Sequence, residues 1–190
     1  MESRDYHRLT LIVGPEGSGK TALLAELAKN VSFYKIIPVT TRPIHADETD
    51  GIDFSFISWE KYRELAENDQ LISTFLKKGN YYGVTYEEFD RAMEKNLPVV
   101  WVVNLEEALK IKVRYPNVKT VLVIARLDSI RRRLEQKGIK TEGMINSKLI
   151  EAKLITDQAP RLDYIVVIED EKMGKAVEQL KEIILKEPEI

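Results

Sequence analysis

Short apolar runs recur along the chain, and each has the length of a buried strand. Most of them are continuous rather than alternating, which is typical of strands covered by helices on both faces of a parallel sheet. They lie at residues 9–13, 35–39, 99–103, 120–125 and 164–168. Helical patterns lie between or after them, at residues 20–29, 105–115, 129–137 and 172–186. This order predicts an α/β fold of three layers, with a parallel sheet between helices.

The long stretch between the second and third apolar runs has its own organisation. Residues 53–58 alternate as a strand, and residues 59–67 carry an amphipathic helical pattern. Residues 71–84 contain two strand-like runs about a Gly-Asn turn, which predicts a hairpin. Thr85 and Glu88 then form a capping-box pattern at the start of another helix. We therefore expect a small mixed β/α subdomain to be inserted into the sheet.

These elements predict one domain over residues 1–190, with an insert and a helical excursion. The large apolar side chains of Trp59 and Trp101 are expected in the core. The expected parts are a core at residues 1–39, 97–128 and 153–190, the insert at residues 40–96, and the excursion at residues 129–152.

The sequence GPEGSGKT follows the first predicted strand and precedes the first predicted helix. It completes the pattern G-x-x-x-x-G-K-[ST] of a phosphate-binding P-loop. Its glycines let the backbone wrap around an anion, to which the helix N-terminus adds a positive dipole. Lys20 can reach the β- and γ-phosphates, and the Thr21 hydroxyl can ligate Mg²⁺. The sequence therefore predicts a nucleoside triphosphate site formed by Gly14, Pro15, Glu16, Gly17, Ser18, Gly19, Lys20 and Thr21.

Composition limits the classes of partner. The chain has 190 residues, 44% of them hydrophobic and 32% charged, with a formal net charge of -2. That charge argues against a general role on nucleic acid or on an anionic membrane, because both favour a basic face. Without cysteine and with two histidines, the chain has neither disulfides nor a Cys/His metal site. No apolar signal region or membrane span is evident, so we expect a cytoplasmic protein, monomeric or homodimeric.

The excursion at residues 129–152 contains two basic helical patterns joined by a loop that Gly138 and Gly143 bound. Glycine hinges suit a moving lid. Arg133 and Lys137 are four residues apart and share a helix face, and Lys148 lies on the following helix. These charges either form a solvated face or supply mobile positive charge around a γ-phosphate.

Taken together, the motifs resemble those of the guanylate kinase family of nucleoside monophosphate kinases. The similarity extends from residue 9 to about residue 185. It rests on GPEGSGKT, on VTTR at residues 39–42, on E-x-x-G-x-D at residues 48–53, on GNYYG at residues 79–83, and on RRRLEQKG followed by NSKL within residues 131–149. The resemblance implies a P-loop kinase fold with an acceptor-binding insert and a helical lid. It also implies transfer of the ATP γ-phosphoryl group to the phosphate of GMP, with Mg²⁺ as cofactor.

The resemblance also implies roles for particular residues. Arg42 would hold the acceptor phosphate and the transition state, Tyr82 would hydrogen-bond the same phosphate, and Glu48 would order the acceptor loop. The family's lid arginines fall on Arg133, Lys137 and Lys148. Positive charge is kept at all three positions, but the bidentate fork of arginine is lost at the two lysines.

Departures from the family pattern concentrate in the acceptor pocket. His45 replaces a second phosphate-binding arginine, Phe54 a tyrosine, Ser73 the glutamate that reads guanine, and Val84 and Pro38 two serines, while Val102 and Asn104 replace two aspartates. Valine and proline cannot make the side-chain hydrogen bonds that guanine requires, and each unmet group costs about 1–3 kcal/mol. Weakened guanine selectivity is therefore expected.

Two functional interpretations remain open on the sequence. The first is an ATP-dependent phosphotransferase, with GMP as the leading acceptor and another small phosphorylated molecule as runner-up. The second is a module that binds ATP but serves interaction or regulation with little or no turnover. The altered acceptor pocket favours the module, whereas the intact P-loop favours the kinase.

Overall fold

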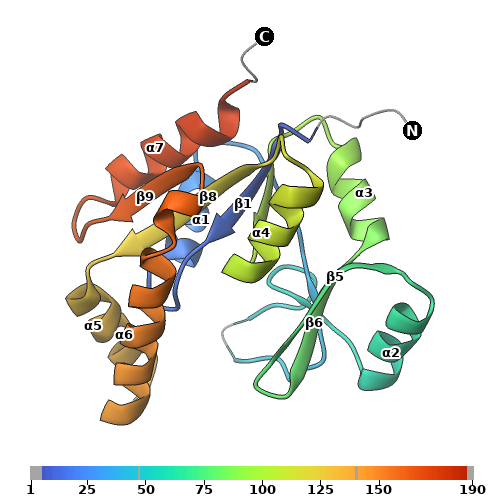
Figure 1. The fold of residues 1–190 in the computed structure, drawn as a ribbon, viewed down its shortest axis with the longest axis horizontal. Helices are drawn as coiled ribbons and strands as arrows, with labels where there is room; N and C mark the ends of the chain where they lie inside the picture. The colour runs from blue at the N-terminus through green and yellow to red at the C-terminus, as the bar shows by residue number, and fades with distance from the viewer. Residues whose placement is uncertain (1–5, 47, 140, 188–190) are drawn as a thin grey trace. The chain divides into compact units, whose positions relative to one another are not determined.

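The computed structural model describes residues 6–46, 48–139 and 141–187, which form two compact units (Figure 1). Unit 1 comprises the described residues up to Phe33 and from Val102 onward. Unit 2 comprises Tyr34–Trp101.

Unit 1 is built on three parallel strands, β1 (Leu9–Val13), β8 (Lys119–Ala125) and β9 (Tyr164–Ile168). The strand β8 pairs with β1 on one side and with β9 on the other. Every residue of β1 is buried, as expected for a continuous apolar strand with helices on both faces. The Val103 N–H also donates to the Ile12 carbonyl of β1 (3.1 Å).

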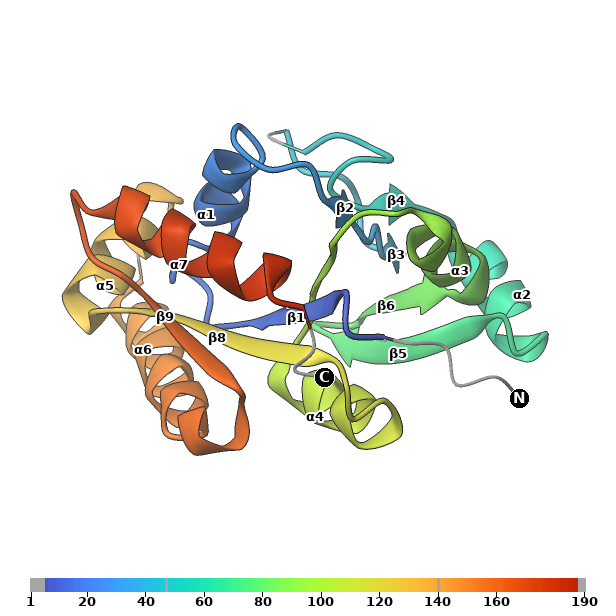
Figure 2. The ribbon, with the colours of Figure 1, turned by 90° about the horizontal axis from the view of Figure 1, so that it is seen from above.

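Helices cover both faces of the unit 1 strands. Figures 1 and 2 show α1 and α7 on one face and α4 and α6 on the other. The helices of this unit are α1 (Lys20–Leu27), α4 (Leu105–Arg114), α5 (Leu127–Gln136), α6 (Glu142–Thr156) and α7 (Met173–Leu185), with a 3₁₀ turn η1 (Ala159–Arg161). The three-layer α/β prediction is therefore confirmed.

A buried lysine joins the sheet to the last helix of unit 1. The Lys119 ammonium donates to the carbonyls of Ile183 (3.1 Å), Ile184 (3.2 Å) and Lys186 (2.7 Å). These carbonyls lie at the C-terminal end of α7, where helix geometry leaves few backbone donors, and that of Ile183 also accepts from the Lys186 N–H (3.3 Å). Burial lowers the pKa of Lys119, and the three acceptors offset part of the cost of placing an ammonium there.

Unit 2 contains a second, mostly antiparallel sheet. Its strand order is β4-β3-β6-β5, in which β3 and β4 are parallel and the other pairs are antiparallel. The strands are β3 (Val39–Thr40), β4 (Ser55–Phe56), β5 (Leu71–Lys77) and β6 (Asn80–Thr85). Two helices, α2 (Trp59–Glu67) and α3 (Tyr86–Glu94), and the parallel pair of β2 (Tyr34–Lys35) with β7 (Val99–Val102) complete this part.

The predicted strand at residues 35–39 is two strands, β2 and β3, which belong to different sheets. Pro38 lies between them, and its ring fixes φ and removes the N–H that a continuous strand would need. Its carbonyl still accepts a hydrogen bond from the Ser55 N–H (2.9 Å). The predicted strand at residues 53–58 is shortened to β4.

Two further expectations in unit 2 are corrected. Trp101 is buried as predicted, but Trp59 is 45% exposed at the first position of α2 and stacks on Tyr81 with ring centroids 4.7 Å apart. Thr85 caps α3 by accepting from the Glu88 N–H. The Glu88 carboxylate does not complete the capping box in the described part of the chain, because it accepts from the Ile37 N–H (2.9 Å).

None of the helices within the described ranges is long and apolar enough to span a lipid bilayer.

A buried carboxyl in α4 predicts pH-dependent stability. Burial raises the pKa of Glu107 to about 7 from its ordinary value of 4.5. A raised pKa means that the folded state binds more protons than the unfolded state, so the free energy of unfolding falls as pH rises from about 4.5 to 7 and then levels. Glu107→Gln should remove this fall, which amounts to about 3 kcal/mol at most.

Urea unfolding at pH 5 and pH 8 measures the effect. Glu106→Gln is the matched control, because Glu106 is the exposed neighbour that pairs with Lys110 (2.6 Å). Parallel pH profiles for wild type and Glu107→Gln would contradict the assignment.

Candidate functional site

The loop between β1 and α1 is held in a shape that only glycine permits at key positions. A Cβ atom on Gly14 would lie 2.3 Å from the Val123 carbonyl oxygen of β8. Gly19 has a left-handed φ of 102° at the N-cap of α1. The loop therefore packs directly against the neighbouring strand and turns sharply into the helix.

Polar groups of this loop are directed inward. The Lys20 ammonium donates to the carbonyls of Gly14 (2.6 Å) and Pro15 (2.9 Å). The Ser18 hydroxyl oxygen is buried and has no hydrogen-bond partner among the described residues. Thr21 lies in the first turn of α1 and is exposed. A buried hydroxyl, an ammonium and glycine backbone in one loop fit a polyphosphate ligand.

Arg133 of α5 reaches the same loop. Its guanidinium donates to the carbonyls of Gly17 (3.1 Å) and Ser18 (2.9 Å), and to the Asp170 carboxylate (2.9 Å). Asp170 follows β9, and it also accepts from the Ser129 hydroxyl (2.5 Å) and from Arg132. The hydrogen bond from Ser129, together with the two arginines, lowers the pKa of Asp170. Asp170 therefore holds Arg133 in position, a role that sequence reasoning missed.

Lys148 of α6 forms the second basic contact with the loop. Its ammonium lies 2.9 Å from the Glu16 carboxylate and 3.1 Å from that of Glu151, and its side chain is 13% exposed. Burial opposes the charge, but the hydrogen bonds that the ammonium donates to these carboxylates raise the pKa of Lys148 overall. The structure thus brings Arg133 and Lys148 to the loop, as the lid hypothesis requires.

Other residues of the expected lid have different surroundings. Lys137 is exposed directly after α5 and makes no ion pair within the part of the chain that the structure describes. Gly138 ends α5 with a left-handed φ of 85°. Gly143 lies in the first turn of α6, so it does not bound the connecting loop as predicted.

In unit 2, Arg42 and Glu48 form a bidentate pair. The two guanidinium nitrogens lie 2.6 and 2.5 Å from the two carboxylate oxygens, and the side chains are 12% and 17% exposed. The hydrogen bonds of this pair raise the pKa of Arg42 and lower that of Glu48. The rings of Phe54 and Phe56 lie 4.9 and 5.2 Å from the guanidinium carbon. Arg42 is therefore a partly buried, oriented cation.

His45 lies at the edge of this pair. Its N–H donates to Glu48 (3.1 Å), and its ring Nδ1 lies 3.6 Å from the same carboxylate oxygen. The ring is largely exposed, and in the described part of the chain the imidazole contacts Glu48 and makes no hydrogen bond to Arg42.

The strands β5 and β6 place the other predicted acceptor residues together. Ser73 is opposite Val84 and Phe75 is opposite Tyr82, so the four side chains share one face of the sheet. Phe75 stacks on Tyr82 with centroids 4.9 Å apart, and Phe54 meets Tyr82 edge-on at 5.9 Å. Sequence reasoning missed Phe75, although its spacing of two residues from Ser73 indicated the shared face.

Other departures noted in the sequence have structural roles. Asn104 caps α4 by accepting from the Glu107 N–H (2.8 Å). Val102 is the last residue of β7, and Pro38 separates β2 from β3.

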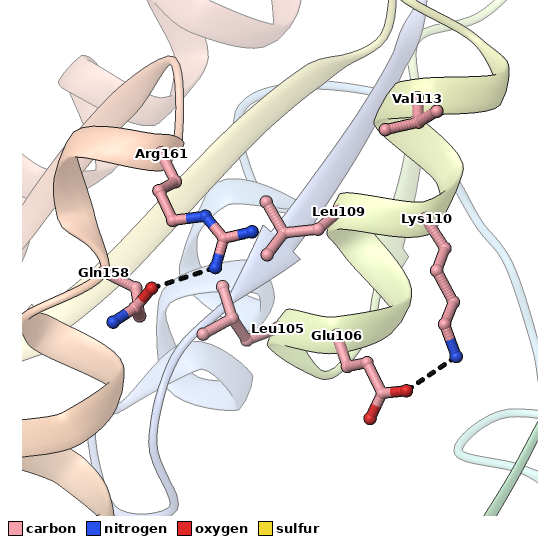
Figure 3. A pocket seen from close by; sticks show the side chains of 7 residues that line it. All are labelled: Leu105, Glu106, Leu109, Lys110, Val113, Gln158 and Arg161. Atoms are coloured by element: carbon pink, nitrogen blue, oxygen red, sulfur yellow. Dashed lines mark hydrogen bonds and ion pairs between the residues drawn. The ribbon is translucent and has the colours of Figure 1, made fainter.

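A separate groove in unit 1 lies between α4 and the segment after α6 (Figure 3). Its volume is about 620 Å³, and its lining residues are Leu105, Glu106, Leu109, Lys110, Val113, Gln158 and Arg161. None of the site residues predicted from the sequence lines it.

Comparison with known proteins gives consistent matches over almost the whole chain. The family model for guanylate kinase matches residues 6–187. The guanylate kinase of Desulfitobacterium hafniense (strain Y51) is 30% identical over 97% of this chain and 92% of its own. That of Chlamydia caviae is 28% identical over 95% of this chain and 88% of its own.

A solved structure supports the fold. The crystal structure of guanylate kinase from Anaplasma phagocytophilum has a TM-score of 0.70, with 22% identity over 93% of this chain and 82% of that chain. At this identity the likeness shows the architecture alone.

The contacts of Asp170 predict its effect on the loop. Asp170→Asn should loosen Arg133 and speed amide hydrogen exchange in residues 14–24 by about three- to tenfold, because the anion that orients the guanidinium is lost. Exchange followed by mass spectrometry measures this. Glu169→Gln is the control, since Glu169 pairs only locally with Lys172 (2.5 Å) in the described structure. Equal exchange in both variants would show that Asp170 does not hold the loop.

Proposed function

The chain belongs to the guanylate kinase family, and on this basis we propose that it transfers the γ-phosphoryl group of ATP to the phosphate of a nucleoside monophosphate, with GMP as the leading acceptor. The observation that carries the proposal is the loop at residues 14–21, where Lys20 and Arg133 both lie against the loop carbonyls. A coupled assay of ADP release with Mg-ATP and GMP tests it.

In this proposal the loop of unit 1 holds the triphosphate. The ammonium of Lys20 exchanges its carbonyl partners for phosphate oxygens, and the buried Ser18 hydroxyl gains an acceptor. Mg²⁺, when bound, neutralises phosphate charge, and the exposed Thr21 hydroxyl is the protein ligand that fits it. The described residues contain no cluster of three His, Cys, Asp or Glu side chains that could hold a metal alone. Arg133 and Lys148 contribute positive charge, with Lys137 as a third cation of the lid.

The acceptor phosphate is held in unit 2. Glu48 presents two oxygens to the fork of Arg42, and a phosphate presents the same geometry with more charge. We propose that the acceptor phosphate replaces Glu48 on Arg42 and that Tyr82 adds a hydrogen bond, while His45 and Phe54 line the site. An oxygen of the acceptor phosphate then attacks the γ-phosphorus. The bond between the γ-phosphorus and the β,γ-bridging oxygen breaks, and ADP leaves. No general base is required, because the acceptor oxygen is already ionised.

The module without turnover has less support. A family match over residues 6–187 and a pre-oriented Arg42 both favour an enzyme. Measurable ATP affinity without ADP release on any monophosphate would favour the module.

The donor assignment predicts the effect of Lys20→Ala. The variant should lose the thermal stabilisation by Mg-ATP, which is about 2.7 kcal/mol in wild type at a ligand concentration of 100 times Kd. Lys29→Ala is the control, because Lys29 is an exposed lysine that pairs with Glu26. An unchanged melting shift in Lys20→Ala would overturn the donor site.

The acceptor assignment predicts a selective loss in Arg42→Ala. Turnover should fall by about 10²–10³-fold, with little change in the Kd for ATP, because Arg42 acts on the acceptor and on transition-state charge. The measurement combines ADP release with ATP titration. Arg63→Ala, an exposed arginine of α2 that pairs with Glu67, should behave as wild type. Equal losses in turnover and ATP affinity would assign Arg42 to the donor site or to folding.

A further inference from the structure

The face of β5 and β6 beside Arg42 is built of rings. The guanidinium of Arg42 lies over Phe54, Phe54 meets Tyr82, and Tyr82 stacks on Phe75 with an interplanar angle of 6°. The aromatic surface therefore begins at the anion site and continues along the sheet. An acceptor whose phosphate lies on Arg42 can place its base against Tyr82 and Phe75, both of which are partly exposed.

This surface has few groups that could read a base. Among the four side chains of the shared face, Val84 is apolar and buried, and Ser73 and Tyr82 carry hydroxyls. Tyr82 also hydrogen-bonds Arg42, which contributes to the raised pKa of that arginine. A hydroxyl such as that of Ser73 can donate or accept, so it does not by itself distinguish a 6-oxo from a 6-amino group.

The carboxylates near this face have other partners. Glu48 lies beside Arg42, at the phosphate end of the site, Asp50 accepts from the Phe56 N–H (2.9 Å), and Asp53 accepts from the Thr49 N–H (2.9 Å). The N1–H and N2–H₂ donors of guanine together require an acceptor such as a carboxylate. Among the described side chains of the shared face none is a carboxylate, so this face lacks the contact that separates guanine from other purines.

We propose that this site recognises its acceptor by phosphate and by aromatic packing, and that it phosphorylates AMP and IMP with efficiencies near that for GMP. This inference rests on the proposed phosphotransferase function. Packing of a base on aromatic rings is tolerant of the base, because every base has a π-face. The acceptor class is therefore purine nucleoside monophosphates.

Steady-state ADP release with Mg-ATP and GMP, IMP or AMP tests the proposal, with Lys20→Ala protein as background. We expect kcat/KM values for the three acceptors within about thirtyfold, since one polar contact separates them at most. A larger preference for GMP over AMP and IMP overturns the inference and leaves the kinase function intact. No ADP release with any acceptor would instead overturn the proposed function.

A substitution at Ser73 tests the role of this residue directly. Ser73→Glu supplies the missing carboxylate and should raise the GMP/AMP ratio of kcat/KM at least tenfold. Thr74→Glu is the matched control, because Thr74 is the exposed neighbour on the opposite face of β5 and should leave the ratio unchanged. Equal ratios in both variants would overturn the role of Ser73. If Ser73→Glu does not fold, as judged by its melting shift with Mg-ATP, the wild-type panel decides alone.

Discussion

Close contact between cations and backbone carbonyls is the constraint on which unit 1 depends. Lys20 and Arg133 together donate to four carbonyl oxygens of the loop after β1, two from Gly14 and Pro15 and two from Gly17 and Ser18. The two side chains bring positive charge to the loop, and the N-terminus of α1 adds to it. The loop can adopt this shape only because Gly14 packs against the Val123 carbonyl of β8. The packing of Gly14 on the sheet therefore sets the shape of the loop, and the shape of the loop sets where the two cations lie.

In unit 2 a carboxylate side chain, rather than backbone carbonyls, accepts the hydrogen bonds of the cation. A partly buried guanidinium is costly unless its donors are satisfied, and Glu48 satisfies two of those of Arg42. The rings of Phe54 and Phe56 lower the local dielectric and strengthen the pair. In both units protein oxygens orient the cation. In the proposed function, phosphate oxygens would replace these protein oxygens with little reorganisation.

Much of the fold followed from local patterns. The strands β1 and β9 and the helix α2 have the predicted bounds, because continuous apolar runs and helical spacing specify them locally. Pro38 divided a run that hydropathy alone read as one strand. The P-loop was evident from its signature, whereas the roles of Asp170 and Phe75 depend on strand pairing and on contacts with α5, which are remote in sequence. Local sequence patterns do not predict such contacts.

The choice between arginine and lysine in the lid follows from geometry. Arg133 divides its fork between two carbonyls and the Asp170 carboxylate, which a single ammonium could not do with the same directions. Lys148 instead lies where Glu16 and Glu151 converge on one point, and a compact ammonium suits that arrangement. Lysine at this position is therefore compatible with a charged lid. Lysine at position 148 keeps the positive charge beside the loop but lacks the two parallel donors of a guanidinium.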